Sequence, residues 1–388
     1  MSRHHSHTSS AIKIIESYAA AEPFAFHLKK HFAANKKHGS KDRKTIASLC
    51  YNYFRLGYLL KNKTTEEKIL AALFLGEHKT NALLQALQPG LNDKILLSTD
   101  EKLAFLNIKA SGIFPLVNEL GAGLNNDSFY KSYLQQPSLF LRLRRGKGKV
   151  VLNKLTEAAI PYTAHRDECI ELENATPLDD LIKINKEAVV QDASSQKVFN
   201  YLDTLPSFAN DNKLTAWDCC AASGGKSILL YDKLKANVQL TVSDIRENIL
   251  INCKKRLQEA GVNIYKSFVA DITKNTLPVG EDNFFIIICD APCTGSGTWG
   301  RNPEQLLYFK KNRIEEYAEK QKLIAQNALQ HLKKDGLFFY ITCSVFKKEN
   351  EEVVDYLKEK FHLQLLQMEY IKGYEIKADT MFVAVFTR

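Results

Sequence analysis

The sequence predicts an α/β protein with a Rossmann-like seven-stranded sheet, preceded by a small α+β module and an all-helical amino-terminal domain. Three observations predict this order. Residues 11–130 show apolar spacing of helical period only, and residues 137–190 mix short strand-like and helical patterns. From residue 191 onward, strands and helices alternate along the chain. A sheet built from such repeats is mostly parallel and carries helices on both faces.

The amino-terminal part divides into three segments. Residues 1–10 are polar and have no apolar core behind them, so we expect a disordered terminus and no signal peptide. Residues 11–130 should form a helical, basic RNA-binding domain, in which Ile12, Ile15 and Tyr18 mark one helix face. Residues 131–190 should form the small α+β module. Its expected elements are a strand over 137–144, a helix over about 150–159, and strands near 162–164 and 168–173.

Residues 191–388 are expected to form the large α/β domain. Its central strands are continuous apolar runs, such as Phe284-Phe285-Ile286-Ile287-Ile288-Cys289, which fit strands buried on both faces. Only Lys372-Gly373-Tyr374 separates the last two strands, so the final strand should be antiparallel. The expected strands cover 214–218, 238–243, 263–269, 284–289, 336–342, 363–370 and 381–387, and the helices about 225–236, 246–260, 304–333 and 348–360.

Charge is unevenly distributed. Residues 1–150 hold 23 Lys and Arg against 11 Asp and Glu, whereas residues 151–388 hold 30 against 33. This excess indicates either a phosphate-rich partner or a solvated lysine surface. The clearest cluster surrounds the predicted start of one helix, where cations and the helix dipole both favour anions. It comprises Lys36, Lys37, His38, Lys41, Arg43, Lys44 and Arg55.

The remaining composition excludes several classes of protein. No apolar stretch reaches the roughly 18 residues that cross a membrane, so we expect no membrane association. Eight cysteines without an export signal predict reduced thiols in a cytoplasmic protein. No C-x-x-C pair is present, so no metal site is expected. We expect a monomer.

Two cysteine segments follow predicted central strands. Asp290-Ala291-Pro292-Cys293 follows the strand at 284–289, and Thr342-Cys343-Ser344 follows the strand at 336–342. The carboxyl ends of neighbouring parallel strands meet at the edge where open α/β sheets bind ligands. Two thiols and a carboxylate should therefore face one crevice and form a candidate reaction centre.

A second candidate site lies after the first three strands. The first strand leads into the loop Cys220-Ala221-Ala222-Ser223-Gly224-Gly225-Lys226, whose small residues let a ligand approach the backbone. The loop matches neither a phosphate-binding P-loop nor the G-x-G-x-x-G pattern. Asp244 closes the second strand and could accept from a ribose diol, and Asp271 closes the third and could accept from an adenine amino group. Each aspartate could instead cap a helix. Together they suit a nucleoside without a pyrophosphate, such as S-adenosylmethionine.

The motifs at 191–196, 220–226, 290–293, 301–304 and 342–344 resemble, in order and context, those of the Sun (Fmu) family of RNA cytosine-5 methyltransferases. The strong likeness covers about 190–388. Residues 137–190 resemble the family's small RNA-recognition-like module. Gly39-Ser40-Lys41-Asp42-Arg43 and the helix it opens resemble a helical antitermination-factor-type domain at the front of the family's enzymes.

The resemblance implies an S-adenosylmethionine-dependent methyltransferase sheet that methylates cytosine C5 in RNA, with ribosomal RNA favoured. It implies that Cys343 is the nucleophile forming a covalent adduct with C6, and that Cys293 assists release. Lys226 and Asp290 would lie near both the base and the cofactor. The implied cofactor-binding residues are Cys220, Ala221, Ala222, Ser223, Gly224, Gly225, Lys226, Asp244, Asp271 and Asp290.

The sequence departs from the family's pattern at two places. Ser223 stands where a proline is usual, which would loosen the cofactor loop. Ala378-Asp379-Thr380-Met381-Phe382 replaces the usual Asp-Gly-Phe-Phe near the base pocket. Three alternatives remain: a non-catalytic RNA-binding ribosome assembly factor, a transfer RNA cytosine-5 methyltransferase, and a DNA cytosine-5 methyltransferase. In the DNA enzymes the P-C cysteine would be the nucleophile.

Overall fold

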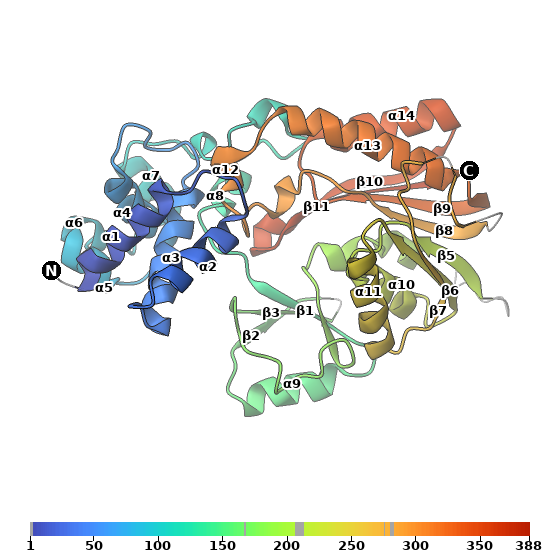
Figure 1. Cartoon of the computed structure of the whole chain (residues 1–388), viewed down its shortest axis with the longest axis horizontal. Coiled ribbons are helices and arrows are strands. Elements are labelled where there is room, and N and C mark those ends of the chain that lie inside the picture. The colour runs from blue at the N-terminus through green and yellow to red at the C-terminus, as the bar shows by residue number, and fades with distance from the viewer. Residues whose placement is uncertain (1–2, 167, 206–212, 275, 280–282) are drawn as a thin grey trace. The chain divides into compact units, whose positions relative to one another are not determined.

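The computed structural model describes residues 3–166, 168–205, 213–274, 276–279 and 283–388. The chain forms two compact units (Figure 1). A helical unit comprises Met1–Gln136 and Trp299–Lys311, and an α/β unit comprises Pro137–Thr298 and Asn312–Arg388. Among the described residues, none of the helices combines the length and the apolar character that a membrane crossing requires.

The helical unit begins earlier than the sequence predicts. Residues 1–10 were expected to be disordered, but Arg3–Glu16 forms helix α1; residues 1 and 2 lie outside the described part. Helix α1 buries Ala11, Ile14 and Ile15. Its first turns are held by Arg3 and His7, which both contact Asp42. The other helices are α2 (Phe24–Ala34), α3 (Ser40–Arg55), α4 (Thr65–Gly76), α5 (Ala82–Leu87), α6 (Pro89–Asn92), α7 (Thr99–Phe105), η1 (Ala110–Gly112), η2 (Val117–Glu119) and α8 (Asp127–Ser132).

The segment Trp299–Lys311 belongs to the helical unit, although it lies within the 191–388 range expected to form one domain. Trp299 is buried and stacks on Phe114, with ring centroids 5.6 Å apart. Arg55, also buried, donates to the Gly300 carbonyl at 2.8 Å. The helix expected over 304–333 is consequently two helices, α12 (Gln305–Tyr308) and α13 (Asn312–Leu329). Packing of the first onto the helical unit interrupts the helical pattern.

The small module is a four-stranded antiparallel sheet with one helix. Its order is β2-β3-β1-β4, formed by Tyr162–Ala164, Cys169–Leu172, Leu139–Leu143 and Ala188–Val190. Helix α9 (Gly148–Glu157) follows β1, and its Val151 and Leu155 are buried against the sheet's apolar side chains. The module belongs to the α/β unit. Arg142 of β1 forms an ion pair at 2.6 Å with the carboxylate of Asp232, which lies on helix α10 (Gly225–Lys233).

The large sheet has seven strands in the order β10-β11-β9-β8-β5-β6-β7. These are Gln364–Lys372, Thr380–Thr387, Leu332–Thr342, Phe284–Asp290, Leu214–Asp218, Val238–Asp244 and Ile264–Val269. The five strands from β9 to β7 are mutually parallel, and β11 runs antiparallel to both β9 and β10. The predicted fold class and the antiparallel final strand are thereby confirmed.

Helices cover both faces of this sheet (Figure 1). On one face, α10 (Gly225–Lys233) and α11 (Glu247–Glu259) pack on side chains that include Ile286 and Ile288. On the other, α13 and α14 (Glu351–Phe361) pack on side chains that include Ile287 and Phe338. Because successive strand residues point to opposite faces, a continuous apolar run supplies both cores. The carboxyl ends of the parallel strands remain uncovered by these helices and carry the candidate site.

Candidate active site

A cleft of about 470 Å³ lies at the carboxyl edge of the parallel strands. Residues that follow β5, β6, β7, β8 and β9 all contribute to its wall, as does one face of α13. Its lining includes Cys220, Ala222, Asp244, Arg246, Asp271, Asp290, Cys293 and Cys343. Both cysteine segments and all three aspartates that the sequence singled out therefore meet at one place within the α/β unit.

The two cysteines are neighbours. Cys293 lies just past β8 and Cys343 just past β9, and their sulfur atoms are 3.3 Å apart. Both are free thiols that are partly accessible. The hydrogen bond with Cys343, reinforced by burial, raises the pKa of Cys293 well above its usual value. A raised pKa favours the protonated form of Cys293, whose thiol can donate a hydrogen bond to the Cys343 sulfur.

A lysine–aspartate pair lies beside the thiols. Lys226, on the first turn of α10, contacts Asp290 at the end of β8, with Nζ and Oδ2 2.6 Å apart. Burial opposes a charge on Lys226, but the charge and hydrogen bond of Asp290 prevail and raise the Lys226 pKa. Lys226 also interacts electrostatically with Cys343. The pair thus places a stable cation and a carboxylate next to the two sulfurs.

Asp244 accepts hydrogen bonds from neighbouring backbone and also lines the cleft. Its carboxylate accepts from the backbone N–H groups of Ala222 and Arg246 at 3.0 and 2.9 Å. The Arg246 side chain also contacts it at 3.1 Å. Burial works against the charge, yet the hydrogen bonds from Arg246 lower the Asp244 pKa below its usual value. Asp244 is consequently a charged acceptor that is already oriented at the cleft wall.

Asp271 is oriented by the residue two positions further on. Its Oδ1 atom accepts from the Thr273 hydroxyl at 2.7 Å and from the Thr273 N–H at 3.0 Å. These bonds lower the Asp271 pKa, the hydroxyl bond most strongly. The carboxylate lines the cleft and stays an acceptor.

The cofactor loop predicted over 220–226 divides into a lining part and a supporting part. Cys220 and Ala222 line the cleft, as does Cys219, which the prediction omitted. Gly224 has φ +79°, and a Cβ there would come within 3.0 Å of the Cys253 sulfur, so only glycine fits. The residues that do not line the cleft are Ala221, Ser223, Gly224, Gly225 and Lys226.

Ser223 is held in place by an arginine. The Arg256 side chain donates to the Ser223 hydroxyl at 2.8 Å and to its carbonyl at 3.3 Å. Arg256 also donates to Asn185 at 2.9 Å and to the Val190 carbonyl at 3.2 Å. These contacts tie the cofactor loop to the small module. They restrain the loop at the position where the resemblance led us to expect a proline.

The second departure, at Thr380, lies against the Cys343 loop. Gly297 donates its N–H to the Cys343 carbonyl at 2.8 Å. A Cβ added to Gly297 would lie 2.1 Å from the Thr380 carbonyl and 3.0 Å from that of Cys343. The preceding turn is fixed by Asp192, which accepts from the Asp379 N–H at 3.0 Å. The motif at 191–196 thus braces this wall of the site.

Sequence reasoning missed part of the cleft wall. Tyr317, Lys320 and Ile324 of α13 line the cleft, and their spacing of three and four residues was the available signal. Arg246 was missed although it follows Asp244 closely. The motif at 301–304 belongs to the helical unit.

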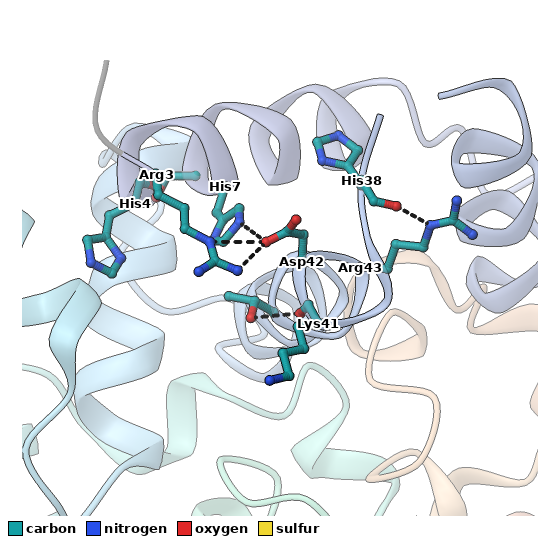
Figure 2. Close-up of polar contacts among 9 residues, drawn as sticks. Arg3, His4, His7, His38, Lys41, Asp42 and Arg43 are labelled. Carbon is teal, nitrogen blue, oxygen red and sulfur yellow. Dashed lines mark hydrogen bonds and ion pairs between the residues drawn. The ribbon is translucent and has the colours of Figure 1, made fainter. Parts of the chain in front are cut away.

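The basic cluster in the helical unit is smaller than the sequence predicts. Arg55 and His38 are buried, and Arg43 donates to the His38 carbonyl at 2.8 Å. In Figure 2, Arg3 and His7 of α1 point toward Asp42 of α3, with contacts of 2.7 and 2.9 Å. These bonds lower the Asp42 pKa. The exposed remainder, called here the lysine cluster, comprises Lys36, Lys37, Lys41 and Lys44.

Known proteins resemble part of this chain in sequence. A family described as 16S rRNA methyltransferase RsmB/F matches residues 207–386. The ribosomal RNA small subunit methyltransferase B of Escherichia coli is 31% identical over 224 residues, which are 56% of this chain and 50% of that protein. The probable enzyme of the same name from Bacillus subtilis is 29% identical over 199 residues, 48% of this chain and 43% of that protein. The chain spans about half the length of these relatives.

Solved structures resemble the fold. The crystal structure of PH0851 aligns with a TM-score of 0.72 and 18% identity over 100% of this chain and 99% of that chain. The crystal structure of NSun6 from Pyrococcus horikoshii with SFG aligns with a TM-score of 0.59 and 14% identity over 70% of this chain and 96% of that chain. At these identities the likeness concerns the fold alone.

Proposed function

We propose that this protein methylates C5 of cytosine in RNA with S-adenosylmethionine as methyl donor and ribosomal RNA as the favoured substrate, because residues 207–386 match a family described as 16S rRNA methyltransferase RsmB/F. One observation carries the proposal: the Cys293 and Cys343 sulfurs lie 3.3 Å apart on the wall of the cleft that also presents Asp290. Cytosine C5 is a poor nucleophile, so its methylation needs a thiolate and an acid at one place.

The cleft suits S-adenosylmethionine. Three successive strands, β6, β7 and β8, end in carboxylates that line it, and such acceptors match the hydroxyl and amino groups of a nucleoside. Asp244 would bind the ribose diol, and Asp271 the adenine amino group. Backbone close to Ala222 would lie against the cofactor. When bound, S-adenosylmethionine supplies an electrophilic methyl group for an activated carbon.

In the proposed reaction, the Cys343 thiolate forms a bond to cytosine C6, and the electron pair of the C5–C6 double bond makes C5 enamine-like. Asp290, as an acid near N3, stabilises the charge that develops on the ring. After C5 has been methylated, a base removes its proton, the C6–sulfur bond breaks, and the double bond and the Cys343 thiolate are restored. Cys293 assists this release.

The position of Lys226 supports the assignment of Cys343, which the resemblance implies, as the nucleophile. Lys226 is positively charged and interacts with Cys343, and a nearby cation stabilises a thiolate. A protonated thiol at 3.3 Å stabilises the same thiolate by hydrogen bonding.

The test incubates the full chain with labelled S-adenosylmethionine in three separate reactions. One contains ribosomal RNA, one transfer RNA and one DNA. Digestion to nucleosides should place the label in 5-methylcytidine from ribosomal RNA. Cys343→Ser protein is the matched control and should transfer none. Label in another nucleoside, or only in DNA, would contradict the proposal, and no transfer to any substrate would favour a non-catalytic assembly factor.

We also propose that the helical unit contributes to RNA binding through the lysine cluster. Its four side chains are exposed, and Asp42, which follows Lys41 in the sequence, is paired with Arg3 and His7 (Figure 2). The positive charge of the cluster is therefore available for phosphates.

A further inference from the structure

The two cysteine loops share one buried carboxylate. Thr294 follows Cys293, and its hydroxyl and N–H donate to Glu349 at 2.5 and 2.9 Å. Ser344 follows Cys343, and its hydroxyl donates to the same carboxylate at 2.5 Å. Glu349 is completely buried. A single side chain therefore binds the residue next to each thiol.

A second buried side chain completes this arrangement. Gln321 of α13 donates to Glu349 at 2.9 Å and to the Pro292 carbonyl at 3.0 Å, so it holds the residue on the other side of Cys293. Tyr340 of β9 donates to the Glu349 carbonyl at 2.6 Å and contacts the Gln321 amide oxygen at 3.1 Å. Both loops are thus tied to α13 and β9, the rigid elements beneath them.

The four donors around position 349 fit a carboxylate better than an amide. Burial raises the Glu349 pKa, but four donors from Thr294, Ser344 and Gln321 favour the charged form. A carboxylate accepts at every position, so it can bind both hydroxyls, a backbone N–H and an amide simultaneously. A glutamine would have to present an NH₂ group to one pair of these donors. Burying a charged side chain costs stability, and an apolar side chain could fill the same space without that cost. A carboxylate at position 349 therefore indicates a role beyond packing.

We propose that Glu349 is a positioning residue that sets the separation and orientation of the Cys293 and Cys343 thiols by binding the residue that follows each of them. The inference rests on the proposed function. Each of the two contacts with Glu349 should affect one step. The Ser344 contact should affect formation of the adduct by Cys343, and the Thr294 contact should affect release of the adduct, which Cys293 assists. Reactions that depend on placement within about 1 Å lose rate by about 10²-fold when the placement is lost.

The test compares Glu349→Gln, Ser344→Ala and Thr294→Val with wild type and with the control Glu352→Gln, an exposed glutamate nearby. Single-turnover experiments with RNA follow the covalent adduct on denaturing gels. Ser344→Ala should slow adduct formation by about tenfold or more, and Thr294→Val should slow its decay similarly. Glu349→Gln should slow both steps, and cofactor affinity should stay unchanged. If Glu349→Gln fails to fold, Ser344→Ala and Thr294→Val still test the inference.

A readout without turnover separates this inference from the proposed function. Diamide oxidises adjacent thiols to a disulfide, which mass spectrometry can assign to Cys293 and Cys343. We expect Glu349→Gln to form this disulfide about tenfold more slowly than wild type and Glu352→Gln to match wild type. A wild-type protein that forms no adduct but shows this difference would reject the function and keep the positioning role. Folded variants with wild-type disulfide and adduct rates would overturn the inference.

Discussion

Lys226 and Asp290 form an ion pair in which Nζ and Oδ2 are 2.6 Å apart. The two residues come from different elements, α10 and β8, and their side chains are 13% and 27% exposed. Asp290 is the more accessible partner and also lines the cleft. The pair therefore presents the Asp290 carboxyl group to a bound base while the lysine stays behind it. In the proposed acid role Asp290 first takes up a proton and then passes it to N3, and Lys226 stabilises the carboxylate that remains.

Asp290→Asn should abolish most of the methyl transfer and preserve ligand binding. An amide cannot supply the proton that stabilises the charged ring, and such acid catalysis is worth about 10²–10⁴-fold in rate. The measurement is kcat with RNA, alongside cofactor affinity by calorimetry. Asp335→Asn, at an exposed aspartate near the start of β9, is the control. A rate within tenfold of wild type for Asp290→Asn would remove Asp290 from the chemistry.

Asp244→Ala should weaken S-adenosylmethionine binding by about 1–3 kcal/mol, because a buried ribose diol would lose its acceptor. Calorimetry on folded protein measures this. The structure shows a second consequence, since the N–H groups of Ala222 and Arg246 would also lose their acceptor. Arg246→Gln is the matched control, because it removes the ion pair and leaves the carboxylate. Equal losses in the two variants would mean that Asp244 only orders the loop.

Asp218 should make stability depend on pH. Burial raises its pKa from 3.8 to about 7, so the folded protein retains a proton that the unfolded chain releases above pH 4. Stability contributed by this group is therefore present below about pH 4 and is lost as pH rises toward 7. In the Asp218→Asn variant, the free energy of unfolding should not fall as this group titrates. The variant should therefore be more stable than wild type by up to about 4 kcal/mol above pH 7. Denaturant unfolding at pH 4, 5.5 and 7.5 measures it, and a pH-independent difference would contradict it.

Replacing the four residues of the lysine cluster by alanine should weaken RNA binding and flatten its salt dependence, by about 0.7–0.9 in slope for each phosphate that is no longer neutralised. The control replaces four other exposed lysines: Lys254, Lys255, Lys333 and Lys334. Both variants have the same net charge, so a difference between them reports location. Equal slopes would mean that the cluster is simply solvated. Deleting residues 1–130 is a poorer test, because it would expose Trp299.

The sheet and the site could be predicted because both depend on local sequence. A run such as 284–289 is apolar throughout, which specifies a central strand, and the residues that follow it must lie at the carboxyl edge. Asp244, Asp290, Cys293 and Cys343 come to the cleft for this reason.

The remaining features depend on contacts that are distant in sequence. Trp299 is buried by Phe114, and nothing near residue 299 indicates that partner. Glu349 lies in the charged stretch 347–352, which has the pattern of an exposed helix start, yet it is buried by Thr294 and Ser344. Strand β4 has three residues, too few to show alternation.

The most direct test of the account is to trap the covalent complex of the full chain with RNA and S-adenosylmethionine. Cys293→Ala should accumulate a protein–RNA species that survives a denaturing gel, because the adduct forms and its release is blocked. Cys343→Ala should be inactive and form no such species. The adduct should also form faster as pH rises, since only a thiolate attacks. A trapped species in Cys343→Ala, and none in Cys293→Ala, would reverse the two roles and contradict the account.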